Sequence, residues 1–305
     1  MATLPGSAKY KLNPDVSRIY PSKLLLFGEY TVLNGSQALA VPLDQWKGSW
    51  KQYERTTITE ETPLYTYVSW LQSHDLISAA SAAHMLTDAE EGWTYEADIP
   101  IGYGLGSSGA FVAALYDRYI TKENSASPAS ALTMLAKMEA FFHGSSSGMD
   151  PMVSYSGEAV LRDDRGQYHN VQDPGWPEDF KVYLLDSRSA RSTGPLVHLY
   201  KAMLTDPVMK HRIERELVPM VEHAIHSYLS SAGSMLEQYI SVIGQFQREH
   251  FSMMIPDPVK DYWDELIETP GVYVKLCGAG GGGYFLVISS TAFKSPSFAH
   301  LKQIV

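Results

Sequence analysis

The sequence predicts a mixed α+β protein, built either as one large domain or as two closely packed domains. Its 305 residues, 45% of them hydrophobic and 19% charged, are enough to bury a large core. Strand-like apolar segments lie toward both ends of the chain, and a mostly helical stretch runs from Leu196 to about Ile255. No internal repeat or low-complexity linker separates the two halves.

The overall charge limits the classes of partner. The chain has 24 basic and 34 acidic residues, a net charge of −10, and no run of basic residues, which argues against nucleic acid or an anionic membrane as a partner. The single cysteine, Cys277, cannot form an internal disulfide. No signal-peptide pattern is present and no window approaches 18 uninterrupted apolar residues, so we expect a cytoplasmic protein without a membrane span.

The first hundred residues contain several strand signals. Lys23–Phe27 is a short apolar run, and Asn34-Gly35 marks a hairpin turn before a returning strand at Ala38–Val41. Alternation of apolar and polar residues continues at Ser49–Ile58 and at Trp93–Ile99. We therefore expect a hairpin followed by two further strands.

A glycine-rich run, Gly102–Gly109, lies between the last of these strands and an amphipathic helix carrying Phe111, Val112 and Leu115. Glycines allow a backbone to approach a ligand closely, and a helix N-terminus offers unpaired N–H groups to an anion. The run could also be only a tight turn with ordinary serine capping. It lacks the Gly-Lys-Ser/Thr ending of a Walker A loop, and it lies too far along the chain for a dinucleotide-binding fingerprint. The sequence therefore favours a phosphate-binding loop of another kind.

A second helix is predicted to begin at Ser127-Pro128, with serine as the N-cap, and to end at Gly144. Its apolar stripe consists of Leu132, Leu135, Ala136 and Phe142. Glu139 falls on the same stripe, where a carboxylate is costly unless it is paired or binds a metal. Glu139 is therefore either a paired residue at the edge of the helix or a metal ligand that faces the glycine run.

The remainder of the chain contains five more strand signals, at Met152–Tyr155, Ala159–Leu161, Lys181–Asp186, Gly271–Leu276 and Tyr284–Ser289. The last two strands are joined by a glycine-rich segment, Cys277–Gly283, which we call the late glycine loop. Proline, glycine and aspartate are frequent in Asp173–Phe180. We place a domain boundary there and predict an N-terminal domain over 1–175 and a C-terminal domain over 176–305.

Taken together, four of these features resemble the GHMP kinase superfamily, which is named for galactokinase, homoserine kinase, mevalonate kinase and phosphomevalonate kinase. The features are a lysine-led strand at Pro21–Lys23, the glycine run, the Glu139 and Asp150 pair, and the late glycine loop. The chain is most similar to the mevalonate kinases. Lys23–Tyr30 resembles their first motif, Glu139–Asp150 follows E-x-x-x-H-G-x-x-S-G-x-D, and Arg191-Ser-Thr193 resembles a substrate-side segment.

The resemblance implies a two-domain GHMP kinase fold, with an N-terminal domain of the ribosomal protein S5 domain 2-like type and a ferredoxin-like α/β C-terminal domain. It implies ATP and Mg²⁺ as cofactors, mevalonate or a related hydroxy acid as the small-molecule substrate, and 5-phosphomevalonate for isoprenoid synthesis as the product. A homodimer is compatible with it. No nucleic acid or membrane is expected as a partner.

The resemblance also implies roles for individual residues. Asp150 would orient or deprotonate the acceptor hydroxyl, and Lys23 would pair with Asp150 and favour its charged form. Ser108 and Glu139 would hold Mg²⁺. The ATP phosphates would lie against Gly104, Leu105, Gly106, Ser107, Ser108 and Gly109. Substrate would lie against Glu29, Tyr30, Ser147, Gly148, Thr193, Gly278, Ala279 and Gly280.

The chain departs from the family pattern at three positions. Ser22 stands where the family usually has glycine, Tyr30 where mevalonate kinases often have histidine, and Gly109 where alanine is usual. A Gly-Glu-Tyr sequence is reminiscent of phosphomevalonate kinases. A phosphorylated acceptor would require extra basic residues, for which Arg188 and Arg191 are candidates. The Asp150 motif favours mevalonate, and phosphomevalonate kinase or another small-molecule GHMP kinase is the alternative.

Two other classes of protein, a serine hydrolase and a non-catalytic nucleotide sensor, match parts of the sequence. Gly144–Gly148 matches G-x-S-x-G, and Asp186 and His198 follow Ser146 in the order of a serine hydrolase. A nucleophile elbow needs a strand before it and a helix after it, whereas here we expect a helix before and a strand after. A nucleotide sensor without catalysis would not require Lys23 and Asp150 together. The kinase hypothesis is favoured over both.

Overall fold

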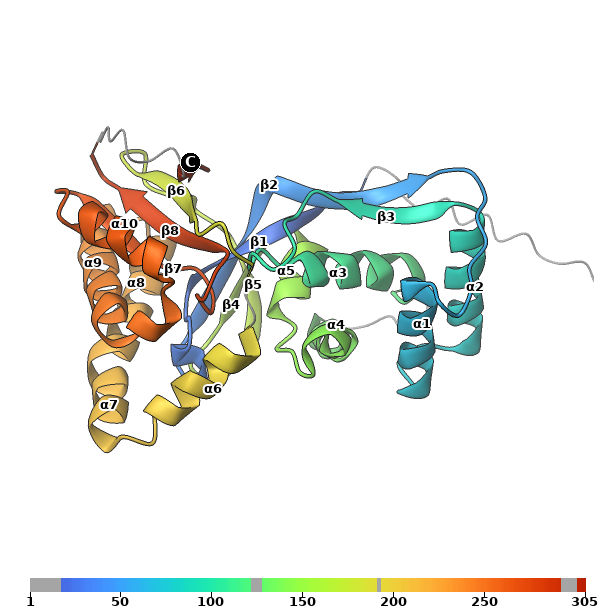
Figure 1. The fold of residues 1–305 in the computed structure, drawn as a ribbon, viewed down its shortest axis with the longest axis horizontal. Coiled ribbons are helices and arrows are strands. Elements are labelled where there is room, and N and C mark those ends of the chain that lie inside the picture. The colour runs from blue at the N-terminus through green and yellow to red at the C-terminus, as the bar shows by residue number, and fades with distance from the viewer. Residues whose placement is uncertain (1–17, 122–127, 191–192, 292–300) are drawn as a thin grey trace, which may run out of the picture.

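The computed structural model describes residues 18–121, 128–190, 193–291 and 301–305. The described strands form two sheets, which meet near the middle of the molecule (Figure 1). The first sheet has the order β1-β2-β4-β5, with β3 also paired to β2, and the second has the order β7-β8-β6-β9. Every strand pair in both sheets is antiparallel. The predicted mixture of helices and strands is confirmed.

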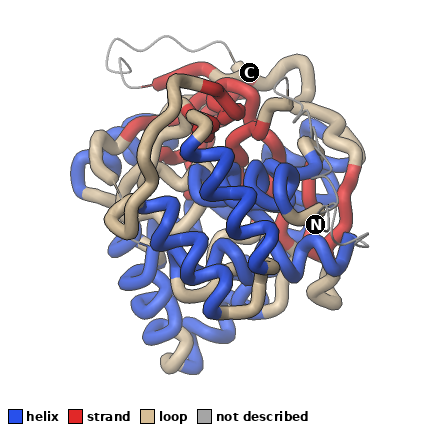
Figure 2. Tube along the Cα trace, turned by 90° about the vertical axis from the view of Figure 1, so that its right-hand side faces the viewer, coloured by secondary structure: helices blue, strands red, loops and turns tan. Residues whose placement is uncertain are grey.

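The first sheet is built around one long strand, β2 (Ala38–Gln52). Strand β1 (Tyr20–Phe27) pairs with β2 along most of the length of β2. Strands β4 (Ala159–Arg162) and β3 (Trp93–Ala97) pair with the first and last residues of β2. Strand β5 (Tyr168–Val171) completes the sheet beside β4. The helices gather on one side of these strands (Figure 2). Lys23 lies on β1, and the glycine run leads into α3, which packs against β1.

Among the described residues, five α-helices accompany this sheet. They are α1 (Pro63–Ser73), α2 (Ala79–Glu90), α3 (Ser107–Tyr119), α4 (Pro128–His143) and α5 (Met149–Ser156). Helices α3 and α5 lie against β1 and β2 and against each other. Helix α3 buries Val112 and Leu115, as its pattern predicted, and α4 buries Leu135 and Glu139. Because α4 also contacts α3 and α5, all three helices contribute to one site.

The second sheet contains β6 (Lys181–Asp186), β7 (Val272–Leu276), β8 (Tyr284–Ser289) and β9 (Leu301–Gln303). Helices lie between β6 and β7 in the chain: α6 (Thr193–Met203), α7 (Pro207–Arg212), α8 (Val218–Leu229), α9 (Gly233–His250) and α10 (Asp257–Ile267). Helices α9 and α10 lie against β7, and α8 reaches back to β1 and β2. The predicted boundary at residue 175 falls between the last strand of one sheet and the first strand of the other, and the domain division stays a prediction.

The structure corrects several predicted elements. Met152–Tyr155, predicted as a strand, lies in helix α5. Left-handed glycines bound this helix, Gly148 at φ +77° and Gly157 at φ +70°, and its first turn tolerates Pro151 because the missing N–H would be unpaired there. The predicted alternation at Ser49–Ile58 ends at Gln52, and the predicted strand at Trp93–Ile99 ends at Ala97.

The predicted hairpin of β1 and β2 forms, but its connection is longer than a two-residue turn. It contains a short 3₁₀ helix, Thr31–Asn34, closed by Gly35 at φ +87°. The helical stretch expected from Leu196 consists of several separate helices. The sequence analysis did not predict α1, α2, α10, β5 or β9. Ser127, the expected N-cap of α4, lies outside the described residues. Among the described residues, none of the helices has the length and apolar character needed to cross a membrane.

Candidate active site

The glycine run folds into a loop that ends at the N-terminus of α3. Gly102, Gly104 and Gly106 have φ between +75° and +78°, a conformation that glycine adopts without steric cost. Gly106 precedes the first residue of α3, so the next backbone N–H groups have no partners within the helix. The backbone N–H of Lys23 donates to the carbonyl of Leu105 at 2.9 Å. The loop is thereby fixed to β1.

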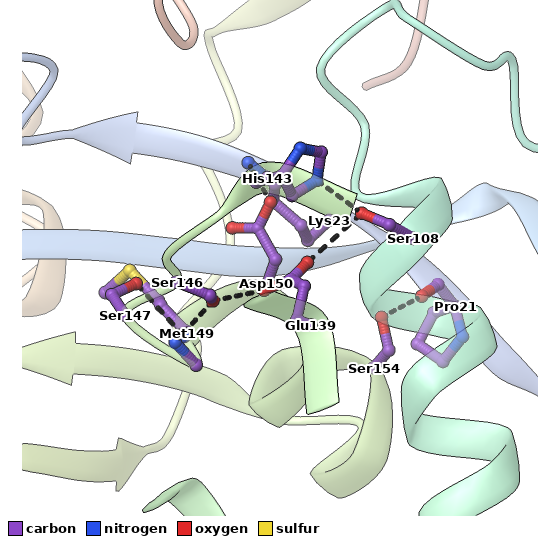
Figure 3. Close-up of polar contacts among 11 residues, drawn as sticks. Pro21, Lys23, Ser108, Glu139, His143, Ser146, Ser147, Met149, Asp150 and Ser154 are labelled. Carbon is purple, nitrogen blue, oxygen red and sulfur yellow. Dashed lines mark hydrogen bonds and ion pairs between the residues drawn. The ribbon is translucent and has the colours of Figure 1, made fainter. Parts of the chain in front are cut away.

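Lys23 and Asp150 form an ion pair beside this loop, with Lys23 Nζ 3.0 Å from Asp150 Oδ2. The Lys23 side chain is 5% exposed and that of Asp150 34%, so the carboxylate still reaches solvent. Asp150 lies in the first turn of α5, where the helix dipole favours a negative charge. Ser154 Oγ donates to the carbonyl of Pro21 at 2.8 Å and fixes α5 against β1 (Figure 3).

Glu139 is the second carboxylate of the site and is buried on α4. Its Oε1 accepts a hydrogen bond from Ser108 Oγ at 3.1 Å, and its Oε2 accepts one from Ser146 Oγ at 2.5 Å. Burial, and secondarily the charge of Asp150, raise the pKa of Glu139 to about 7. The carboxylate therefore lies on the predicted buried stripe and faces the glycine run. Phe142, which was predicted on the same stripe, is 42% exposed.

His143 and Ser146 join this cluster, although the sequence did not single them out for it. His143 Nε2 lies 3.0 Å from Ser108 Oγ, and a hydroxyl that donates to Glu139 can accept from this ring nitrogen. Ser146 Oγ also accepts from the backbone N–H of Gly148 at 2.9 Å. His143 lies four residues after Glu139, on the same face of α4, and that spacing was the available signal.

The oxygen atoms of this cluster suit a hard divalent cation. Ser108 and Glu139 offer a hydroxyl and a carboxylate, the donor types that Mg²⁺ takes in phosphate-handling sites. In the described ranges, the side chains of histidine, cysteine, aspartate and glutamate form no group of three or more that could hold a metal. A Mg²⁺ ion with one or two protein ligands, and with phosphate and water for the others, fits this arrangement.

The serine hydrolase arrangement is not assembled. The Ser146 hydroxyl donates to Glu139, His198 Nδ1 lies 3.0 Å from the carbonyl of Gly194, and Asp186 Oδ1 accepts from the backbone N–H of Arg188. Ser146 also lacks the context of a nucleophile elbow, because α4 precedes it and α5 follows it. The segment after Ser146, which was expected to be a strand, is helix α5. The segment before Ser146 is helix α4 and not a strand, so a nucleophile elbow is still excluded.

Glu29 and Tyr30 connect the β1 end of the site to the late glycine loop. Glu29 forms an ion pair with Lys275, and both side chains are almost completely buried, at 1% and 0% exposure. Lys275 also donates to the carbonyl of Leu276. The Tyr30 hydroxyl donates to the carbonyl of Ala279 at 2.5 Å. Glu29 and Tyr30, which were expected to contact substrate, therefore also connect the two sheets. The sequence analysis did not identify Lys275 as a residue of this region.

The late glycine loop is packed closely on several sides. Gly278 and Gly280–Gly283 have φ between +70° and +149°. A Cβ atom at Gly283 would lie 2.6 Å from the carbonyl oxygen of Tyr103, so this loop touches the beginning of the glycine run. The backbone N–H of Gly283 donates to the carbonyl of Ser189 at 2.7 Å. The two glycine-rich segments therefore meet at the junction of the two sheets.

The remaining expected site residues are placed as follows. Ser147 is exposed and accepts from the backbone N–H of Met149 at 3.3 Å, while Gly148 is buried against the carbonyl of Leu132. Thr193 is the first residue of α6. Arg191 lies outside the described residues. Lys23, Ser108, Glu139 and Asp150 are brought together, as shown in Figure 3.

Known proteins with similar sequences point to one family. The family model of the GHMP kinases N terminal domain matches residues 76–158. A mevalonate kinase of Archaeoglobus fulgidus is 27% identical over 271 residues, covering 86% of this chain and 88% of that protein. A mevalonate kinase of Thermococcus onnurineus is 27% identical over 297 residues, with 86% of each covered.

Solved structures show the same architecture. A structure of L. major mevalonate kinase in complex with R-mevalonate has a TM-score of 0.64 at 16% identity, covering 93% of this chain and 94% of that one. A Streptococcus pneumoniae phosphomevalonate kinase has a TM-score of 0.63 at 15% identity, covering 90% and 92%. The expected two-domain GHMP kinase fold is confirmed by this likeness. By its sequence and its fold the chain is thus similar to the GHMP kinases, and these likenesses support an ATP-dependent small-molecule kinase.

Proposed function

We propose that this kinase transfers the γ-phosphate of ATP to the 5-hydroxyl of mevalonate. The observation that carries the proposal is the Lys23–Asp150 pair at 3.0 Å, beside the Ser108–Glu139 contact at the N-terminus of α3. This arrangement combines a carboxylate that can meet a hydroxyl with a helix end that can meet phosphate. The names of the curated relatives support mevalonate as the acceptor.

The glycine run would receive the phosphates of ATP. The backbone N–H groups of the first turn of α3 point out of its N-terminus, and Ser107 and Ser108 are partly exposed there. Ser108 and Glu139 would hold Mg²⁺, which when bound neutralises charge on the phosphate oxygens. The charged form of Glu139 is the one that binds a cation, and its raised pKa means that a proton competes for the same oxygens.

Asp150 would accept the proton of the acceptor hydroxyl as it attacks phosphorus. Its carboxylate is 34% exposed, so an acceptor can reach it, while Lys23 holds the opposite side of the group. Phosphoryl transfer relies mainly on positioning of the reactants and on compensation of negative charge. Proton transfer from the hydroxyl to a carboxylate held in place contributes further to the rate. Lys23 is nearly buried and cannot swing freely, so it fixes the orientation of Asp150.

The acceptor would bind between the two predicted domains, 1–175 and 176–305. In this proposal the acceptor would contact Tyr30, Ser147, Thr193 and the late glycine loop, as the resemblance implies. The contact of Gly283 with Tyr103 supports it, because the loop of the second sheet then reaches the phosphate-binding run. Phosphomevalonate is the second candidate acceptor, supported by the Gly-Glu-Tyr30 sequence and by Arg188 at φ +58° beside the late glycine loop.

A panel of acceptors tests the proposal. The purified chain is incubated with Mg-ATP and with mevalonate, phosphomevalonate or homoserine, and ADP release is followed by a coupled assay. We expect saturable turnover that is greatest on mevalonate. A higher kcat/KM on phosphomevalonate would transfer the proposal to the second candidate. Absence of turnover on both would contradict the proposed function.

A further inference from the structure

Gly109 packs directly against the backbone that carries Asp150. It lies in the first turn of α3 and is buried there. A Cβ atom at this position would lie 2.8 Å from Asp150 C and from Pro151 N, and 3.0 Å from Asp150 Cβ. The φ angle of Gly109 is not left-handed, so space, and not backbone conformation, requires glycine here.

Gly106 makes the corresponding contact on the other member of the ion pair. A Cβ atom at Gly106 would lie 2.8 Å from Lys23 Cγ and 3.7 Å from Asp150 Oδ2. Leu105 contributes the backbone hydrogen bond to Lys23 described above. The glycine run thus contacts Lys23 through Leu105 and Gly106, and Asp150 through Gly109, in addition to the phosphates that it is proposed to bind.

We propose that Gly109 is a positioning residue for Asp150 and does not itself contact ATP. By allowing α3 to touch the first turn of α5, Gly109 sets the distance of the Asp150 carboxylate from Lys23 and from the N-terminus of α3. The burial of Gly109 supports this role, because Ser107 and Ser108 are the residues of that turn left partly exposed to a ligand. The inference rests on the proposed function and refines one residue of its site.

The expected displacement follows from the contact distances. An ordinary contact of a Cβ atom is 3.4 Å or longer, so an alanine at 2.8 Å must push the Asp150 peptide by about 0.6 Å. Misplacement of about 1 Å in an active site can cost about 100-fold in rate. We therefore expect Gly109→Ala to lower kcat about tenfold. Alanine favours helix more than glycine does, so the variant is expected to fold.

Gly233→Ala is the matched control. Gly233 is the first residue of α9, its φ is not left-handed, and an added Cβ would meet Pro177 at an ordinary 3.4 Å. We expect this control to keep the kcat of the wild type. Gly109→Ala should lower kcat while the KM for ATP and the affinity for an ATP analogue change less than about twofold. In an Asp150→Asn background, Gly109→Ala should cause no further loss.

Three results would overturn the inference: an unchanged kcat, an equal loss of kcat in the Asp150→Asn background, or a loss confined to ATP affinity. A crystal structure of Gly109→Ala separates this question from the function itself. We expect the Lys23 Nζ to Asp150 Oδ2 distance to increase from 3.0 Å. Such a shift supports the inference even if neither mevalonate nor phosphomevalonate is phosphorylated, which would contradict only the proposed function. An unshifted Asp150 would contradict the inference.

Discussion

Replacing Lys275 by methionine tests how the two sheets are held together at the site. Lys275 extends from β7 and forms an ion pair with Glu29, which follows β1. Neither side chain is more than 1% exposed to solvent. Glu29 Oε2 is buried and none of the residues that the structure describes gives it a hydrogen bond, so the carboxylate depends heavily on Lys275. Methionine has a similar length and preserves the packing against Phe27, over whose ring the Lys275 ammonium lies at 5.4 Å.

The magnitude follows from this burial. Removing one partner of a buried ion pair leaves an uncompensated charge and costs about 3–5 kcal/mol of unfolding free energy. The double variant Glu29→Gln/Lys275→Met removes both charges, and replacing a whole buried pair is often close to neutral. Lys260→Met is the surface control, because its partner Asp257 is 92% exposed and such exposed pairs contribute little to stability.

Urea denaturation followed by circular dichroism measures these differences at several pH values. Burial raises the pKa of Glu29, and Lys275 opposes that rise. Without Lys275 the pKa should rise further, so the folded variant takes up a proton that the unfolded chain releases above about pH 4.5. The loss of stability in Lys275→Met should therefore be larger at pH 8 than at pH 5.5.

Two outcomes would refute this reasoning. A loss below about 1 kcal/mol, equal to that of the surface control, would show that the pair is not buried as described. A large loss that is the same at pH 8 and pH 5.5 would show that the charge of Glu29 is not its cause. Equal losses in the single and double variants would likewise assign the effect to packing.

Three further predictions concern the site. Asp150→Asn should retain ATP-analogue binding but lower kcat by about 10²–10⁴, as measured in the coupled assay, and near-normal turnover would remove Asp150 from its proposed role. Glu139→Gln should raise the Mg²⁺ concentration needed for half-maximal activity. Because the folded pKa of Glu139 is raised to about 7, the metal-free wild type should gain stability as the pH falls from 8 toward 5, and urea denaturation should show a flatter dependence in the variant. Tyr30→Phe loses the hydrogen bond to Ala279 but keeps its stacking on Tyr200, so we expect a loss of about 0.5–1.5 kcal/mol by urea denaturation and no change of fold; an unchanged stability would contradict that contribution.

The glycine run and Glu139 were predicted from local patterns, whereas the roles of Lys23 and Asp150 were implied by the family resemblance. The glycine run was recognised because a close approach and a helix N-terminus both leave a signature in neighbouring residues. Glu139 was found because a carboxylate on an apolar helical stripe conflicts with its surroundings. Both arguments use residues within one or two helical turns. In the structure the glycine run ends at the N-terminus of α3 and Glu139 is buried on α4, as these arguments expected.

The misjudged features depend on contacts between distant segments. Helix α5 was predicted as a strand because Met152 and Val153 form an apolar pair in a run too short to define its periodicity. Lys275 resembles a solvated residue in the strand sequence, and only packing of β7 against the turn after β1 shows that it is buried with Glu29. The contact of Gly109 with Asp150 likewise joins helices separated by α4, so no local pattern encodes it.

The most direct test of the central claim is phosphorus NMR of a reaction containing the wild-type chain, Mg-ATP and mevalonate as the sole acceptor. The account predicts that the γ-phosphate signal of ATP declines while one phosphomonoester signal appears, coupled to the C5 methylene protons of the product. Asp150→Asn at the same concentration should give little of that signal. ATP that stays intact in the wild-type reaction, or a phosphate attached at another oxygen, would contradict the account.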